Sequence, residues 1–428
     1  MCACSRSSIT ALLAAILLIC SPGCTGGENN SSFGSVTLPE GGGTTDPGPL
    51  DVYSTGLPVV EINTEGGAPI VSKEDYLAAD FRIVGKSAAD DLGPLSCSVR
   101  GRGNTTWTWP KKPYLVKLDS KASVFGLPAH KRWILLANFM DRTMMRNLVS
   151  MKVASLTSLA WTPSCRPVEL VLNGSHMGNY LLIEQVRVDK NRVDISDEGF
   201  LLELDFHYDN PVQWKDHDIP FAIKHPDEED IKPARVQEIK DYISSVSNAI
   251  YGPDFKDAAK GYANYLDVDS FVDYWIVYEV MGNHELGNPG SVYMHKDAGT
   301  KLSAGPCWDF DWGVLSYNTS PHAKTGFVNR YAIWYARLFD DPAFRSKVKA
   351  RFQELLPQLS TIPDYMEECR SMLGKSAVLN FAIWNPAEDS SQNGGHIING
   401  DENLTFDAAV DRLKDIYKER LKVILSNL

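Results

Sequence analysis

The order of the secondary-structure patterns along the chain limits the folds that it can adopt. Short alternating or β-branched segments fill much of the first half, and longer segments with helical spacing dominate the second half. The predicted strands are Leu57–Asn63, Phe81–Val84, Cys97–Asn104 (ending in a Gly-rich turn), Pro113–Leu118, Val168–Leu172, Gly178–Glu184, Phe200–Asp205, Phe221–Lys224, Ser291–His295 and Lys301–Ala304. The predicted helices are Asp141–Leu159 (with Asp141 as N-cap), Ala234–Tyr251, Val268–Val280, a stretch around Tyr331–Leu355, and Phe406–Leu428. This order indicates an α+β fold with a β-rich N-terminal half and a mostly helical C-terminal half, compatible with two lobes around a cleft.

The first residues indicate an exported protein. A basic residue, Arg6, precedes the apolar run Ala11–Ile19 and a small-residue exit at Ser21-Pro22-Gly23, which is the pattern of a secretory signal peptide. The run is shorter than the roughly 20 apolar residues that span a bilayer. Gly23 before Cys24 favours a bacterial lipobox with lipidation of Cys24, although Ser21 stands where such motifs usually carry Leu. We expect a cell-envelope lipoprotein anchored to the inner or outer membrane, with simple secretion as the alternative.

Composition divides the rest of the chain into a linker and a domain. Residues 24–56 are rich in Gly, Ser, Thr, Pro and Asn, and such a segment buries too little apolar surface to offset the entropy of ordering. We therefore predict a signal peptide at residues 1–23, a flexible linker at 24–56 and a folded domain at 57–428. The whole chain is 43% hydrophobic, which is ample for a large core.

Charge and cysteine content exclude some functions. The net charge of −12 argues against a nucleic-acid partner but leaves room for ATP in a locally basic cleft. The thiols of Cys97, Cys165, Cys307 and Cys369 lack the spacing of a metal site. Buried free thiols are favoured for these four, with two disulfides as the alternative.

A Gly-rich basic hairpin is the first candidate site. It runs through Arg100-Gly-Arg-Gly-Asn-Thr-Thr-Trp107 and returns through Lys111–Lys117. Backbone amides in such a turn can approach an anion, and nearby Arg and Lys side chains can hold phosphate oxygens. An ordinary hairpin with a solvated basic rim is the simpler interpretation of this segment alone.

Two acidic segments are the other candidates. The loop Gly282–Asn288 follows an apolar helix and carries Asn283, His284, Glu285 and Asn288, although polar residues at a helix exit are common. In Trp308–Gly313, Asp309 and Asp311 stand at i and i+2, so on extended backbone both carboxylates would project to one side and suit a hard cation such as Mg²⁺. A turn that merely hydrogen-bonds its own backbone is the alternative. The chain contains no Walker A, Gly-x-Ser-x-Gly or His-Glu-x-x-His motif.

Four ordered motifs resemble those of the CotH family of atypical, kinase-like proteins. They are Arg100–Leu118, Trp133–Asn138 with Asp141 and Arg146-Asn147, Asn173-Gly174 with Gly178–Gln185, and Gly305–Gly313. The resemblance covers nearly all of the chain after the linker. It implies a strongly diverged protein-kinase-like, two-lobed fold that binds ATP and Mg²⁺ or Mn²⁺ and transfers phosphate to Ser or Thr of proteins.

The resemblance also implies roles for single residues. Arg102 and Asn104 would form the loop over the phosphates, and Lys117 would contact phosphate. Glu184 would lie near the nucleotide, either as an ion-pair partner of Lys117 or on the adenine side. Asp309 would bind metal with Asp311 as a helper, and Asn288 would serve a second metal. The implied catalytic residues are Asp309 and Glu285.

One departure from the family pattern affects the expected activity. Many relatives carry Asp in an Asn-x-Asp loop after the long helix, whereas this chain has Asn283-His284-Glu285. The extra methylene moves the carboxylate by about 1.5 Å, and a shift of about 1 Å can lower a rate considerably. The alternative functions are therefore a catalytically weak or inactive surface module that binds glycan or protein, and a structural envelope protein.

Overall fold

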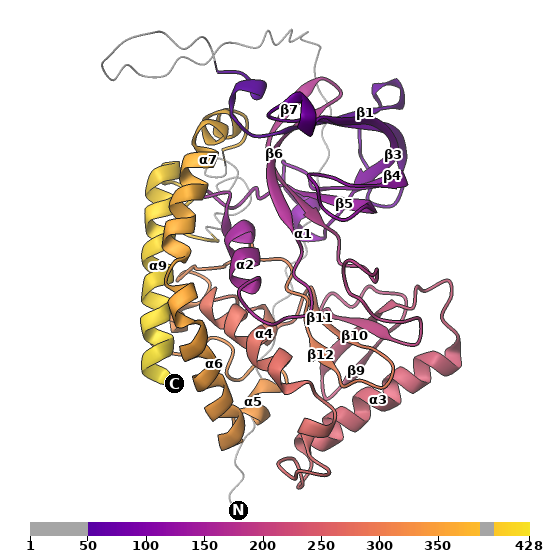
Figure 1. Cartoon of the computed structure of the whole chain (residues 1–428), viewed down its shortest axis with the longest axis vertical. Helices are drawn as coiled ribbons and strands as arrows, with labels where there is room; N and C mark the ends of the chain where they lie inside the picture. Colours follow the sequence, from indigo (N-terminus) through magenta and orange to yellow (C-terminus); the bar gives the residue numbers. More distant parts are fainter. Residues whose placement is uncertain (1–49, 386–397) are drawn as a thin grey trace, which may run out of the picture. The chain divides into compact units, whose positions relative to one another are not determined.

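Seven strands from the first half of the chain close into a barrel (Figure 1). The structure is a computed structural model that describes residues 50–385 and 398–428. Around the barrel the strand order is β1-β2-β3-β4-β5-β7-β6, and β1 closes it by pairing in parallel with β6. The bounds are β1 Val59–Thr64, β2 Leu77–Val84, β3 Leu92–Gly101, β4 Tyr114–Ala122, β5 His130–Leu136, β6 Cys165–Leu172 and β7 Ser175–Glu184.

The two faces of the barrel strands have different surroundings. Because side chains alternate along a strand, Val116 of β4 and Trp133 of β5 fill the barrel interior. Leu115 and Ile134 point outward and join the core that the barrel shares with the helices. The outer face of β4 and β5 therefore meets the helical half of the protein.

A second sheet of five strands follows the barrel in the chain. Its order is β12-β11-β8-β10-β9. The bounds are β8 Phe200–Leu204, β9 Gln213–Asp216, β10 Ile219–His225, β11 Val292–Lys296 and β12 Ser303–Ala304. Leu202, Phe221 and Val292 from this sheet lie in the shared core.

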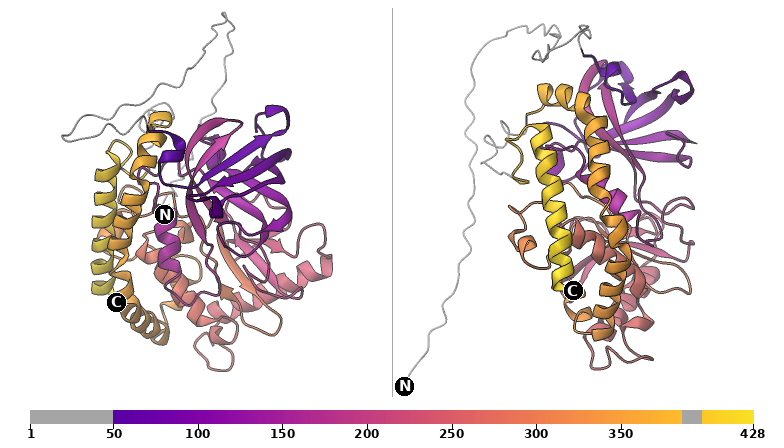
Figure 2. Two further views of the ribbon diagram at one scale, coloured as in Figure 1. Left: turned by 45° about the horizontal axis from the view of Figure 1, so that its top comes forward. Right: turned by 60° about the vertical axis from the view of Figure 1, so that its left-hand side comes forward.

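Helices make up most of the second half. Their bounds are α1 Thr105–Thr108, α2 Arg146–Ala154, α3 Pro233–Tyr251, α4 Val268–Val280, α5 Tyr335–Leu338, α6 Pro342–Leu359, α7 Ile362–Ile383 and α9 Phe406–Asn427. Short 3-10 helices are η1 Val52–Ser54, η2 Glu65–Gly67, η3 Ala88–Asp90, η4 Tyr262–Asn264, η5 Glu285–Gly287 and η6 Pro321–Lys324. Helix α4 is buried on all sides from Ser270 to Val280. Helices α7 and α9 lie side by side, and α7 also contacts β7 (Figure 2).

The predicted α+β class is confirmed, with most strands in the first half and most helices in the second. The closed barrel was not predicted, because the sequence pattern of a strand does not reveal which partner closes the sheet. The Asn173-Gly174 hairpin is present, with φ of 49° and 77° at these two residues.

Two helix predictions were inaccurate, and one helix was not predicted. Helix α2 begins at Arg146, so Asp141 is not its N-cap; instead Asp141 accepts hydrogen bonds from the backbone N–H groups of Thr143 and Arg146. The stretch around residues 331–355 divides into α5 and α6, with Asp341 capping α6. Helix α7 was missed entirely.

The predicted signal peptide, Cys24 and most of the linker lie outside the described residues. Residues 50–428 form one unit, and the segment 50–56 within it includes η1 and a buried Thr55. Among the helices that the structure describes, none combines the length and hydropathy needed to cross a bilayer. All four described cysteines are buried and free, as favoured from the sequence.

Candidate active site

The turn Trp308–Gly313 brings two carboxyl groups into contact. Asp309 has φ of 62°, so the backbone is left-handed here and not extended as predicted. The carboxyls of Asp309 and Asp311 nevertheless lie close enough to interact, and both side chains are partly exposed. Burial raises the pKa of both groups, and the charge of Asp309 raises that of Asp311 further. A shared proton or a bound cation would relieve the repulsion between the two carboxylates.

Two carboxamides hold this turn in place. Asn147 of α2 accepts a hydrogen bond of 2.8 Å from the Phe310 N–H. Asn399 accepts one of 3.1 Å from the Gly313 N–H and donates one of 3.4 Å to the Asp311 carbonyl. Since both amides come from distant parts of the chain, the tertiary fold fixes the backbone around the carboxyl pair.

A buried network of ion pairs also supports the acidic turn. The guanidinium of Arg146 contacts Asp141 at 2.5 Å and Asp401 at 2.6 Å. Its Nε donates to the Val314 carbonyl at 2.8 Å. Arg146 thus joins α2, the acidic turn and the segment before α9.

Glu285 provides a third carboxyl group. Its Oε2 is buried and has no hydrogen-bond partner among the described residues. Burial raises its pKa well above the usual value, and the charges of Asp309 and Asp311 add to this effect. The Asn283 side chain orients the loop, because its oxygen accepts the Glu285 N–H at 2.9 Å and its nitrogen lies 3.5 Å from the Asp309 carbonyl.

The Glu285 loop is tied to the last helix. Asn329 donates to the Asn283 carbonyl at 2.8 Å, and its own N–H donates to Glu279 of α4 at 2.9 Å. Glu279 forms a fully buried ion pair of 2.5 Å with Arg420 of α9. The position of the loop therefore depends on α4 and α9 together.

Arg102 connects the Gly-rich hairpin to the acidic turn. Its guanidinium lies 5.6 Å from the ring centroid of Trp308, and its charge counteracts the rise in the pKa of Asp309. Just before it, a Cβ on Gly101 would stand 2.3 Å from the Trp107 ring, so only glycine lets the loop close over the barrel end.

Lys117 and Glu184 are not brought together. Lys117 of β4 is opposite Arg132 on the outer barrel face, where its side chain is exposed. Glu184 shares the inner face with Trp133, accepts the Ser164 N–H at 2.9 Å and lies 3.6 Å from Arg192. An ion pair between Lys117 and Glu184 is therefore not formed.

Asn104, Asn288 and His284 form no hydrogen bond with the carboxyl groups of Asp309, Asp311 and Glu285 among the described residues, although a Cβ on Gly313 of the acidic turn would stand 3.0 Å from the His284 ring. Asn104 is exposed, and its side-chain oxygen accepts from Lys73 at 3.4 Å. Asn288 is exposed at the end of η5 and makes no side-chain hydrogen bond within the described part of the chain. His284 is partly buried, its Nδ1 has no hydrogen-bond partner there, and burial lowers its pKa.

The carboxyl pair fits a hard cation that shares its coordination with a ligand. Across residues 50–385 and 398–428, no three His, Cys, Asp or Glu side chains are grouped as a complete metal site. Two adjacent carboxylates with a third nearby are the donor set that Mg²⁺ uses when substrate phosphate oxygens and water complete its octahedron. The orphaned Oε2 of Glu285 is consistent with a positive charge or a donor at this place.

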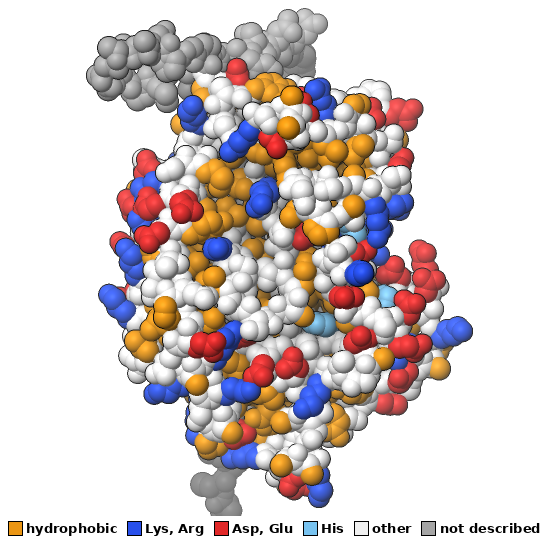
Figure 3. Space-filling view, in the orientation of Figure 1, with side chains coloured by type: hydrophobic (Ala, Val, Ile, Leu, Met, Phe, Trp, Pro, Cys, Tyr) orange, Lys and Arg blue, Asp and Glu red, His pale blue; other side chains and the backbone are white. Residues whose placement is uncertain are grey.

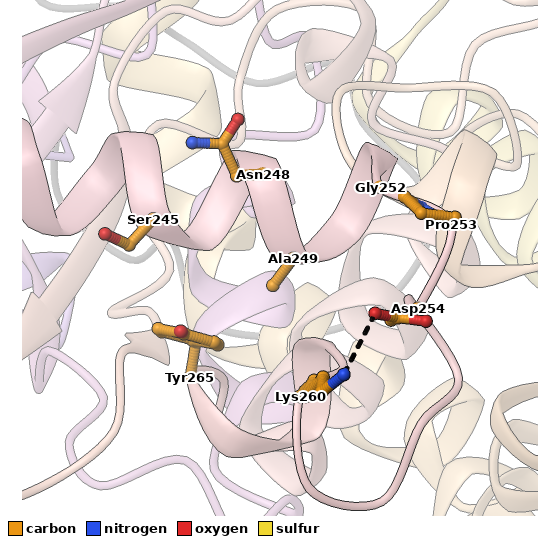
Figure 4. Close-up of a pocket in the computed structure, with 8 residues that line it drawn as sticks. All are labelled: Ser245, Asn248, Ala249, Gly252, Pro253, Asp254, Lys260 and Tyr265. Carbon is orange, nitrogen blue, oxygen red and sulfur yellow. Dashed lines mark ion pairs between the residues drawn. The ribbon is translucent and has the colours of Figure 1, made fainter.

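Two pockets among the described residues do not contain the carboxyl groups of Asp309, Asp311 or Glu285. One lies at the C-terminal end of α3, where Lys260 pairs with Asp254 at 3.6 Å (Figure 4). The other is lined by residues that include Arg192, His295, Gly305 and Pro306. It thus borders the strand that leads to Asp309 but contains neither aspartate.

The sequence analysis missed the residues that support the site. Asn399 and Asp401 lie in a segment without a recognisable sequence motif. In the sequence, Arg420 resembles the other basic residues of a surface helix. No signal in a single sequence pairs Asn399 with Gly313. Only their hydrogen bond in the folded chain reveals the connection.

Comparison with known proteins adds one finding. A family model described as CotH kinase protein matches residues 99–424. The match begins in β3 and ends in α9, so it includes Arg102, both acidic segments and Arg420. No curated protein matches the chain.

Proposed function

This chain belongs to the CotH kinase protein family, and we propose on that premise that it is a phosphotransferase that depends on ATP and Mg²⁺ or Mn²⁺. It transfers phosphate to Ser or Thr hydroxyls of surface or secreted proteins. In this proposal the barrel corresponds to the nucleotide-binding lobe of a diverged kinase, and the helical half corresponds to the catalytic lobe. Neither nucleic acid nor a membrane span takes part, and a lipid at Cys24 is the only anchor.

The proposal rests on one observation: the positive charge of Arg102 interacts with the carboxyl groups of Asp309 and Asp311. Arg102 comes from the Gly-rich hairpin of the barrel, and Asp309 comes from the helical half, yet the charge of Arg102 acts on the Asp309 carboxyl. A polyphosphate with a bound cation needs both a basic and an acidic contact at one place. Binding of a neutral glycan would require neither.

The cation would be held by Asp309 and Asp311. When bound, it neutralises the charge of the phosphate oxygens that it contacts. Asn147 and Asn399 keep the two carboxyls in position through the backbone of the turn. Arg102 would provide a positive charge to phosphate oxygens near the same carboxyl pair.

Glu285 is the residue we assign to the acceptor. A substrate hydroxyl gives its proton to the Glu285 carboxylate while its oxygen forms the new bond to the γ-phosphorus. The bond between that phosphorus and the bridging oxygen breaks, and ADP leaves with the bonding electrons. Asn283 orients Glu285 for this step by accepting its N–H.

Labelled ATP provides the direct test. The purified full-length chain is incubated with γ-labelled ATP and Mg²⁺ or Mn²⁺, and label is measured in the chain itself and in a generic Ser/Thr-rich acceptor protein. We expect metal-dependent labelling that Asp309→Asn lowers by at least about a hundredfold, as loss of a charge-stabilising group does. Asp230→Asn, at an exposed aspartate without side-chain partners in the described residues, is the matched control.

The result also separates the proposal from its alternative. If ATP and metal bind without labelling any acceptor, the cleft is retained in an inactive binding module. If label enters the Asp309→Asn variant at the normal rate, Asp309 is not the metal ligand and the proposed site is wrong.

A further inference from the structure

A second binding site can be inferred at the C-terminal end of α3, where the surface is hollowed (Figure 4). Side chains from within residues 245–254 line one side of the hollow, and Lys260 and Tyr265 line the other. We call it the α3 pocket. Its volume is about 290 Å³, just below the range of about 300–1,000 Å³ that is usual for drug-sized ligands. The α3 pocket therefore suits one small molecule.

Helix α3 provides polar groups and space to one side of the pocket. Ser245, Asn248, Ala249 and Gly252 recur at helical spacing, so they lie on one face of the helix. The Asn248 side chain is exposed and makes no hydrogen bond within residues 50–385 and 398–428, although a carboxamide can both donate and accept. Ala249 has only a methyl group, which leaves room beside it.

The loop after α3 forms the other side of the pocket and is held firmly. The Tyr262 N–H donates to the Phe255 carbonyl at 3.1 Å, and the Tyr262 hydroxyl donates to Asp341 at 2.8 Å. A Cβ on Gly261 would stand 2.3 Å from the Phe255 carbonyl oxygen, so this return of the chain requires glycine. Because Phe255 and Tyr262 are also buried, the pocket is formed in advance and binding needs little ordering of the loop.

Tyr265 presents an aromatic ring to the pocket. Its carbonyl accepts from the Tyr242 hydroxyl at 3.0 Å and from the Leu302 N–H at 2.8 Å, and the two tyrosine rings meet edge to face with centroids 6.4 Å apart. The ring is thus fixed, while its hydroxyl has no hydrogen-bond partner in the described part of the chain. The face of such a ring carries partial negative charge, so polarised C–H groups pack well against it.

Asp254 and Lys260 add an acceptor and a donor whose charges cancel. Their nearest oxygen and nitrogen are 3.6 Å apart, which is longer than a hydrogen bond, and their side chains are 58% and 72% exposed. Each group therefore keeps most of its capacity to bind a ligand. The other residues that line the pocket are uncharged, so the pocket has no net charge and does not favour an ion.

These features match the chemistry of a neutral sugar ring. A pyranose has adjacent hydroxyls that both donate and accept hydrogen bonds, and a patch of polarised C–H groups. An apolar ligand would instead leave the carboxylate, ammonium and carboxamide of the pocket without partners, at a cost in binding free energy.

We propose that the α3 pocket binds one neutral pyranose unit, either a free monosaccharide or the terminal unit of a glycan. The Tyr265 ring packs against the C–H groups of the sugar. Asp254 and Lys260 hydrogen-bond adjacent hydroxyls, and Asn248 binds a further one. The site takes no part in phosphate transfer, so it does not depend on the proposed function.

Ligand-observed NMR with the full-length chain tests the site. Glucose, galactose, mannose and N-acetylglucosamine are titrated separately, each as the free sugar and as its methyl glycoside. We expect saturable binding of at least one of them with a dissociation constant on the order of 1 mM, because a few contacts in an exposed pocket give a small binding free energy. Equal binding of the glycoside indicates a glycan end as the ligand, and loss of binding on methylation indicates a free monosaccharide. Either result supports the inference.

Two variants locate the binding in the pocket. Ala249→Leu fills the space beside Asn248 and should weaken binding by at least about tenfold. Asn248→Ala removes one set of hydrogen bonds and should weaken it by about threefold to tenfold. Ala234→Leu is the matched control, since Ala234 is exposed on the same helix and does not line the pocket. All three variants should keep the melting temperature of the unmodified chain within a few degrees, because they change surface positions.

Three results would overturn the inference. The first is that none of the eight compounds binds saturably at concentrations on the order of 10 mM. The second is that Ala249→Leu and Ala234→Leu bind the sugar equally well, which would place the sugar elsewhere. The third is that acetate or ethylamine displaces the sugar, which would show that the pocket recognises a charge. Labelling from ATP should be unchanged in Ala249→Leu, so failure of either proposal leaves the other standing.

Discussion

The candidate site contains ionisable side chains whose burial lowers the stability of the fold. Asp309, Asp311 and Glu285 place three carboxyl groups close together, and burial raises the pKa of each. Such groups would destabilise a fold that had no use for them. Lys111 is a second costly residue: it is 2% exposed and donates to the Asn179 carbonyl and to Asn380 of α7.

Replacing Glu285 should raise the stability of the protein and lower its proposed activity. Glu285→Gln removes one of three mutually repelling carboxyls, so the metal-free protein should gain on the order of 1 kcal/mol in its free energy of unfolding. Labelling from ATP should fall sharply, because the amide cannot accept the proton. Urea unfolding in EDTA measures the first effect, with the exposed Glu228→Gln as control. A destabilised Glu285→Gln variant would show that the carboxyl is structural.

Lys111 should make stability depend on pH. Burial lowers its pKa from 10.5 to about 7 in the folded protein. Between about pH 7 and 10.5 the unfolded chain therefore binds more protons, and the contribution of Lys111 to stability rises with pH by at most about 1.4 kcal/mol per unit. Below about pH 7 both states are protonated and the contribution is constant.

Urea unfolding at pH 7 and pH 9 measures this slope. Lys111→Met should lower the stability at both pH values, because two carbonyl oxygens lose their donor, and it should also reduce the difference between them. Lys131→Met, at an exposed lysine, should retain the difference. An unchanged slope in Lys111→Met would contradict the assignment.

At the scale of elements, the candidate site is formed by short loops that helices and strands hold in place. The Gly-rich hairpin is closed by Trp107 over Gly101, and the Glu285 loop is fixed by α4 and α9. Loops positioned by rigid elements are a common place for catalytic groups. The α-helices and strands therefore position the candidate carboxyl groups without containing them.

Gly101→Ala should disturb the hairpin specifically. Its Cβ would lie 2.3 Å from ring atoms of Trp107, which is too close for any side chain, so Trp107 must leave its place against the barrel. We expect about a tenfold or greater loss in ATP affinity, because Arg102 follows directly after. The control is Gly326→Ala, where a Cβ meets nothing within 4 Å. Normal ATP affinity in Gly101→Ala would show that Arg102 does not depend on this closure.

The buried ion pair between α4 and α9 should contribute far more to the free energy of unfolding than an ion pair on the surface. Glu279 and Arg420 are fully buried, so Arg420→Ala leaves an unpaired charge and should cost about 3–5 kcal/mol in unfolding free energy. Arg370→Ala, which breaks the pair with the exposed Asp411, should cost less than about 1 kcal/mol. Denaturant titration compares the two, and similar losses would contradict this ranking.

At the scale of the whole molecule, opposite charges are concentrated in different regions. Acidic side chains are frequent near β9, β10 and the adjoining loops, where Asp227, Glu228, Glu229 and Asp230 are consecutive and exposed (Figure 3). On the barrel, by contrast, the basic side chains of Arg100, Lys117 and Arg132 surround Tyr76. The net charge of −12 therefore says little about the charge of any one surface.

The sequence predicted local elements well and their assembly poorly. Helix α4 matches its predicted range, because its apolar run has clear ends, and the Asn173-Gly174 hairpin follows from turn chemistry. Helix α7 was missed because its buried face includes Cys369, Ser376 and Asn380, which weaken the apolar period. Closure of the barrel depends on the parallel pairing of β1 with β6, which no local pattern encodes.

At the candidate site, too, single residues could be predicted from the sequence but their arrangement could not. Asp309, Asp311 and Glu285 could be selected from short motifs, and the fold gathers them. Glu184 was placed near the nucleotide by resemblance alone, but the strand register turns it to the opposite face from Lys117. The hydrogen bond from Arg132 to Tyr76 was not predicted, because a single basic residue in a strand carries no signal until its neighbours across the sheet are known.

The pairing of Glu279 with Arg420 also has a consequence for the order of biosynthesis. The ribosome makes the Glu285 segment well before it makes α9, so a nascent chain contains both acidic motifs before the buried partner of Glu279 exists. The ion pair between Glu279 and Arg420 therefore forms only when the last helix docks. A chain interrupted before that helix would keep all three carboxyl groups and leave Glu279 without its cation.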